Sequence, residues 1–132
     1  MTPAEKAKEA FDLYAAMSGK ELPPSSISAL QVRLYRWQTA NFGGQDIHRP
    51  LLGAVEEVGE LSHALLKHEQ GIRGLKSRAA FLEAAGDAVA DTVIYLMQVC
   101  THLRLDFGVL LKETAENVME RDWNLDSEKG GE

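Results

Sequence analysis

The sequence predicts an all-α protein, and two observations support this prediction. Apolar residues recur every three or four positions over most of the chain, which is the spacing of a helix with one buried face. Alternation of apolar and polar residues is never sustained long enough to predict a β-strand. The 132 residues, 45% of them hydrophobic, suffice for one domain with its own core. We expect an antiparallel bundle of four core helices and a short N-terminal helix, completed by assembly into a homodimer or homotetramer.

Five helices are predicted, each from its periodicity and from the residues at its ends. They span residues 3–18, 25–40, 50–70, 77–103 and 106–121. Pro23 and Pro24 break the chain after the first helix. Ser25 or Ser26 can cap the second helix, and Pro50 favours the first turn of the third.

The order of these elements divides the chain into three predicted parts. Residues 1–24 are predicted as an N-terminal helical extension and linker, residues 25–123 as the helical domain, and residues 124–132 as a polar tail. Asp106 is placed to cap the last helix of the helical domain.

Composition excludes several classes of protein. The net charge of -6, from 20 acidic and 14 basic residues, argues against a binder of nucleic acid polymers, which displays clustered Lys and Arg. Cys100 is the only cysteine, so no internal disulfide can form. The N-terminus lacks the pattern of a signal peptide, and no apolar segment reaches the ~20 residues of a membrane span. We therefore expect a soluble cytoplasmic protein.

The stretch "LLGAVEEVGE", residues 51–60, carries three glutamates on an otherwise apolar helix. At 100° per residue, Glu56 and Glu60 lie opposite the apolar face, and Glu57 lies on the border. That predicted apolar face consists of Leu51, Ala54, Val55, Val58, Leu61 and Leu65. Taken alone, this segment is also what an ordinary solvated helix face looks like.

The next helix strengthens the case for a site. Its polar residues form one stripe: Glu83, Asp87, Asp91, Tyr95 and Gln98. Nearly all other positions are apolar, which predicts a buried helix and therefore a buried carboxylate at Asp91. Such a group needs a cation or a salt bridge, or it must give up its charge. The alanines of this helix allow a neighbour to come close, which would bring the glutamates across from Asp87 and Asp91.

Several carboxylates around one space repel one another unless positive charge is supplied. Oxygen ligands of this kind suit Mg²⁺ or Mn²⁺. Because Mg²⁺ keeps positions open for water and phosphate oxygens, the pattern predicts a metal site that is completed by a polyphosphate substrate.

"EEVGE" followed by "DAVADTVIYL" resembles the MazG-like all-α nucleoside triphosphate pyrophosphohydrolases, whose signature is Glu-Glu-x-x-Glu and then Glu-x-x-Asp on the next helix. The similarity covers about residues 28–123. It implies cleavage of a nucleoside triphosphate between the α and β phosphates, which yields the monophosphate and pyrophosphate. A housekeeping role in the nucleotide pool would follow.

The resemblance also implies roles for individual residues. Glu57, Glu60 and Asp91 would bind Mg²⁺, and Glu56 would be a further ligand or would, with Glu57, orient and deprotonate the attacking water. The sequence departs from the signature at Ala88, where the family has glutamate. Asp87, four positions before Asp91, stays on the same face and would replace it.

Further residues are candidates for contact with the substrate. Trp37, with Asn41 and Phe42, would form a wall on which a base stacks, unless Trp37 fills the core. Tyr95, one turn after Asp91, is placed to reach a sugar or phosphate. On the last helix the candidates are Lys112, Asn117 and Arg121, the latter two mainly by family analogy.

Two alternatives of other classes remain open. A non-catalytic helical module would use its acids to pair with basic residues of a partner. A di-iron carboxylate bundle would use Glu-x-x-His motifs from two helices, and only one, Glu60 to His63, is present.

Overall fold

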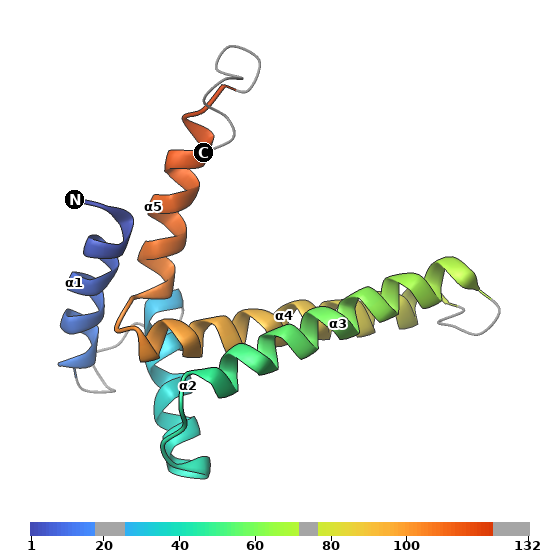
Figure 1. Cartoon of the computed structure of the whole chain (residues 1–132), viewed down its shortest axis with the longest axis horizontal. Helices are drawn as coiled ribbons and strands as arrows, with labels where there is room; N and C mark the ends of the chain where they lie inside the picture. Colours follow the sequence, from blue (N-terminus) through green and yellow to red (C-terminus); the bar gives the residue numbers. More distant parts are fainter. Residues whose placement is uncertain (18–25, 72–76, 123–132) are drawn as a thin grey trace. The chain divides into compact units, whose positions relative to one another are not determined.

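A computed structural model of the chain describes residues 1–17, 26–71 and 77–122. Its helices are α1 (Pro3–Ala15), α2 (Ile27–Phe42), α3 (His48–Gln70), α4 (Arg78–His102) and α5 (Phe107–Met119), shown in Figure 1. These ranges contain no strand, so the predicted all-α class is confirmed. The predicted linker after α1, the connection at 72–76 and the polar tail lie wholly or mostly outside the described residues.

Contacts divide the chain into two compact units. Unit 1 comprises Met1–Arg33 and Arg104–Glu132, and unit 2 comprises Leu34–Leu103, so the division falls within α2. The arrangement as one four-helix bundle and the predicted domain boundaries remain predictions.

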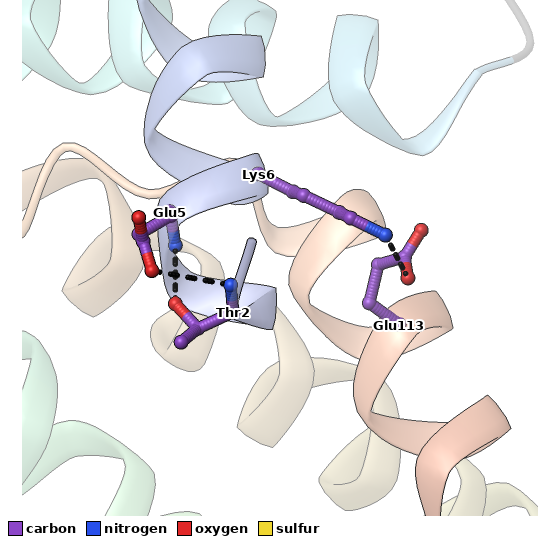
Figure 2. Close-up of polar contacts among 4 residues, drawn as sticks. All are labelled: Thr2, Glu5, Lys6 and Glu113. Atoms are coloured by element: carbon purple, nitrogen blue, oxygen red, sulfur yellow. Dashed lines mark hydrogen bonds and ion pairs between the residues drawn. The ribbon is translucent and has the colours of Figure 1, made fainter.

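In unit 1, α1 packs along α5. Thr2 begins α1 with a capping box, in which its hydroxyl accepts from the Glu5 backbone N–H and the Glu5 carboxylate accepts from the Thr2 N–H. Lys6 reaches across to α5, with its Nζ 2.9 Å from Oε2 of Glu113 (Figure 2). The N-terminal helix is therefore held by a second element rather than by local signals alone.

Buried polar groups tie α2 to the start of α5. Asp106, 2% exposed, caps α5 by accepting from the Val109 N–H, and it also accepts from the Ser28 hydroxyl at 2.9 Å. Gln31, also 2% exposed, donates to the Leu105 carbonyl and accepts from the Phe107 N–H. Because a buried polar group without a partner is costly, these reciprocal bonds fix the junction.

The predicted caps are confirmed at two helices, where Asp106 caps α5 and Ser26 accepts from the Ala29 N–H at the start of α2. Ser77, where the fourth helix was predicted to begin, caps α4 through the Ala80 N–H. Helix α3 begins two residues earlier than predicted, at His48, and Pro50 still lies in its first turn. Proline is tolerated there because the first N–H groups of a helix have no partner within it.

In unit 2, α3 and α4 pack against each other and run antiparallel (Figure 1). Near one end of the pair, the Tyr95 ring lies against the backbone at Gly53. Near the other end, His68 stacks on Phe81 with ring centroids 4.3 Å apart. Residues late on α3 therefore lie beside residues early on α4, which places Glu57 close to Asp91.

The face of α3 that contacts α4 differs from the predicted apolar face. Ala54 and Ala64 are buried, whereas Val55 is 62% and Val58 49% exposed. The buried and half-buried positions are Pro50, Gly53, Ala54, Glu57, Leu61, Ala64, Lys67 and His68. Small residues let the two backbones approach, so the contact is centred on them and Glu57 falls inside it.

The predicted burial of α4 and of Asp91 is wrong for this chain. Ala88, Met97 and Cys100 are buried, but Asp91 is exposed, as are Val89 and several other apolar residues of the helix. The reason is that α3 covers one side of α4, and apolar composition alone does not say how many neighbours a helix has. Asp91 therefore needs no buried counter-charge in the single chain.

Taken singly, none of the described helices is long and apolar enough to cross a membrane. Helices α4 and α5 meet the length and composition requirement only as a pair.

Candidate functional site

Three glutamates of α3 form a carboxylate cluster (Glu56, Glu57 and Glu60). One carboxylate oxygen from each lies within 4.8 Å of the other two. Glu56 and Glu60 are exposed and Glu57 is half-buried. Within the described ranges, this is the group of acidic, His or Cys side chains that is close enough to hold a metal ion.

Helix geometry explains why these three side chains converge. Residues four apart lie one above the other along a helix, and neighbours in sequence are 100° apart around it. Glu56 and Glu60 therefore share one line, while Glu57 sits beside it towards α4. A continuous helix without a kink thus presents three anionic groups to one space.

The surroundings of Glu57 disfavour the charged form of its carboxyl group. Loss of solvation raises the pKa of this carboxyl, and the negative charges of Glu60, Asp91 and Glu56 raise it further. A hydrogen bond with Glu60 acts in the same direction. Asp91 belongs to α4, so a carboxylate of the neighbouring helix is among the charges that act on Glu57.

The cluster is close enough to hold a metal ion, but its carboxylates would have to move closer together to do so. Mg²⁺ holds oxygen atoms at about 2.1 Å, so neighbouring ligands of an octahedral ion are about 3.0 Å apart and opposite ones about 4.2 Å. The carboxylate oxygens lie within 4.8 Å of one another. The donors are all carboxylate oxygens, which Mg²⁺ and Mn²⁺ prefer over soft ligands.

The second predicted acid of α4, Asp87, is less closely tied to the cluster. It is exposed, one turn before Asp91, and is not among the charges that raise the pKa of Glu57. Ala88, where the resembling family has glutamate, is only 3% exposed.

Tyr95 lies one turn beyond Asp91 on α4, and its ring is half-buried against α3. Sequence reasoning selected Tyr95 but missed Gly53, on which the ring lies. The only signal in the sequence was a glycine inside a helix, where it is unfavourable and therefore needs a reason.

The aromatic candidates of α2 are exposed in unit 2. Trp37 is 56% exposed, so it is not a core residue of this chain. Its ring meets Phe42 edge-on, with centroids 5.7 Å apart. The side-chain amide of Asn41 donates to the Trp37 carbonyl one turn earlier, so this donor is already used within the helix.

Three further predicted substrate residues belong to unit 1. Lys112 and Asn117 lie on α5, and Arg121 follows its end. All three side chains are exposed. They are charged or polar groups able to meet phosphate, and their assignment to the site remains a prediction.

His63, on which the di-iron alternative depends, is exposed on α3 and is not part of the carboxylate cluster. The cluster therefore offers oxygen ligands alone. A di-iron site of the Glu-x-x-His type would need imidazole ligands as well.

Comparisons with protein-family models, with curated proteins and with solved structures gave no match to the chain.

Proposed function

We propose that the chain is a Mg²⁺-dependent nucleoside triphosphate pyrophosphohydrolase, which cleaves the bond between the α and β phosphates. The observation that carries the proposal is the cluster of Glu56, Glu57 and Glu60, with its oxygens within 4.8 Å. A second support is the coupling of Asp91 to Glu57 across two helices. The order and helical context of these acids are those of the MazG-like signature.

In this proposal Glu57, Glu60 and Asp91 hold the metal, and Asp87 takes the place of the missing glutamate. When bound, Mg²⁺ or Mn²⁺ would neutralise the carboxylates and polarise phosphate oxygens of the substrate. Mn²⁺ is an alternative to Mg²⁺ because both accept hard oxygen ligands at similar distances.

Glu56 and Glu57 are proposed to orient and deprotonate the attacking water. The oxygen of water bonds to phosphorus, its proton passes to a carboxylate, and the bridging P–O bond breaks to release the monophosphate and pyrophosphate. The pKa of Glu57 is raised in the cluster without metal, and a bound cation would lower it by favouring the charged carboxylate.

For the substrate, we propose that Tyr95 bonds a sugar or phosphate oxygen and that Trp37 with Asn41 provides a surface for the base. We propose that this reaction serves housekeeping of the cytoplasmic nucleotide pool.

We also propose that the chain assembles into a homodimer or homotetramer. Support comes from the large apolar side chains that are exposed on both helices of unit 2, including Leu52, Val55 and Leu66 on α3 and Leu82 and Val89 on α4. Light scattering coupled to size exclusion tests this, and a mass of 14.5 kDa, that of one chain, would contradict it.

The decisive experiment is a panel of nucleoside triphosphates with Mg²⁺, with pyrophosphate release as the readout. Asp91→Asn and Glu60→Gln should each lower kcat/KM by at least about 100-fold, since even residues that merely orient metal ligands cost 10–100-fold. Asp46→Asn is the matched control, because Asp46 is an exposed acid of unit 2 outside the cluster. No pyrophosphate from any nucleotide would refute the proposal.

Calorimetry distinguishes the proposed enzyme from a non-catalytic acidic module. A pyrophosphohydrolase binds Mg²⁺ or Mn²⁺ without any protein partner, whereas a non-catalytic acidic module does not. The same titration with Glu57→Gln should lose most of the binding heat if the cluster is the metal site.

A further inference from the structure

Gly53 is the glycine of α3 at which a side chain has no room. A Cβ built there would lie 2.6 Å from both Cε1 and Cζ of Tyr95 and 2.8 Å from Cδ1. Real Cβ atoms do not approach other heavy atoms so closely. At Gly59 and Gly86, in the same pair of helices, a Cβ would meet nothing within 4 Å.

The glycine at this position is explained by the approach of the Tyr95 ring and not by backbone conformation. Among the described residues, the glycines with positive φ are Gly43 and Gly71, so Gly53 has a helical backbone that any residue could adopt. Glycine inside a helix is unfavourable because it loses more freedom on folding than alanine. What it permits here is direct contact between an aromatic ring and the backbone of the neighbouring helix.

This contact fixes the ring beside the carboxylate cluster. Gly53 precedes Glu57 by one helical turn on α3, and Tyr95 follows Asp91 by one turn on α4. The Tyr95 ring is half-buried, and within the described part of the chain its hydroxyl makes no hydrogen bond. A held ring with an unused hydroxyl is a ready hydrogen-bond donor at the end of the cluster.

We propose that Gly53 is a positioning residue, which holds the Tyr95 ring against α3 so that the hydroxyl donates to an oxygen of the bound triphosphate. The inference rests on the proposed function for the identity of the ligand. Gly53, which has no side chain, thereby sets the binding geometry through a close contact between two helices.

The test measures binding of non-hydrolysable α,β-methylene nucleoside triphosphates with Mg²⁺ by calorimetry. Gly53→Ala and Tyr95→Phe should each weaken binding by about tenfold, the loss expected for one hydrogen bond to a charged group. The double variant should be no weaker than either single variant, because both remove the same bond. Gly59→Ala is the matched control and should bind as the unaltered protein does.

Two further measurements separate a positioning role from a structural one. The Mn²⁺ affinity of Gly53→Ala should stay within about twofold, since the phenol is not a metal ligand. If Gly53→Ala fails to fold by circular dichroism, adding Tyr95→Ala should restore folding by removing the clash. Absence of that rescue overturns the proposal.

Other outcomes are equally decisive. Unchanged analogue binding in Gly53→Ala, or losses that multiply in the double variant, overturns the proposal. If the unaltered chain binds the analogues with the expected variant pattern but cleaves no nucleotide, the proposed function fails and the role of Gly53 stands. If it binds none of the analogues, the role of Gly53 fails as well.

Discussion

Replacing Asp106 by alanine should be among the most costly single changes in unit 1. The carboxylate is 2% exposed, caps α5 through the Val109 N–H and accepts from the Ser28 hydroxyl at 2.9 Å. Loss of a helix cap costs about 1 kcal/mol, and loss of a buried bond to a charged group costs about 2 kcal/mol more. We therefore expect a decrease of about 3 kcal/mol in the free energy of unfolding.

Urea denaturation followed by circular dichroism, at one protein concentration, measures this decrease. Thr2→Ala is the matched control, because Thr2 also caps a helix of unit 1 but is exposed. It should cost about 1 kcal/mol, the cap alone. Equal losses for the two variants would show that the Ser28 bond contributes nothing, which would refute the reasoning.

Three further changes have defined outcomes. The raised pKa of Glu57 means that the folded chain binds this proton more tightly than the unfolded chain, so stability falls as pH rises from the ordinary value of 4.5 through the folded value. In a chelator, Glu57→Gln should therefore raise Tm at neutral pH, and the gain should vanish on acidification below 4.5. Gly86→Ala should stabilise α4 by about 1 kcal/mol in urea denaturation, because helical glycine is unfavourable and the added methyl meets open space. A double-mutant cycle on Lys6 and Glu113, with alanine at each, should give a coupling of at most about 1 kcal/mol, because the ion pair is partly exposed.

Each of these outcomes can be contradicted by a simple result. A gain for Glu57→Gln that persists at acidic pH would locate its cause outside the carboxylate charges. A destabilised Gly86→Ala would mean that α4 is covered at this position. A coupling of several kcal/mol would show that the pair shown in Figure 2 is shielded from water.

Helix existence and helix ends were predictable because their signals are local. Ser26, Ser77 and Asp106 each place an oxygen at the first unpaired N–H groups of a helix, and this requires no knowledge of the rest of the fold. The convergence of Glu56, Glu57 and Glu60 was predictable for the same reason, since all three lie on one helix.

The contacts between helices could not be predicted in the same way. Periodicity marked Val55 and Val58 as the inner face of α3, but close approach of two backbones favours small residues such as Ala54 and Ala64. The seating of Tyr95 on Gly53 depends on the register of two helices, which no local signal encodes. The pairing of α1 with α5 joins the ends of the chain and was likewise outside sequence reasoning.

The buried thiol of Cys100 gives the chain an internal reporter. It is the only sulfhydryl, and a bulky disulfide reagent can reach it only when the last turns of α4 separate transiently from their neighbours. The rate of labelling then measures how often this part of α4 opens locally, independently of unfolding of the whole chain. Any ligand that stabilises the packing of α3 against α4 should lower the rate of Cys100 labelling.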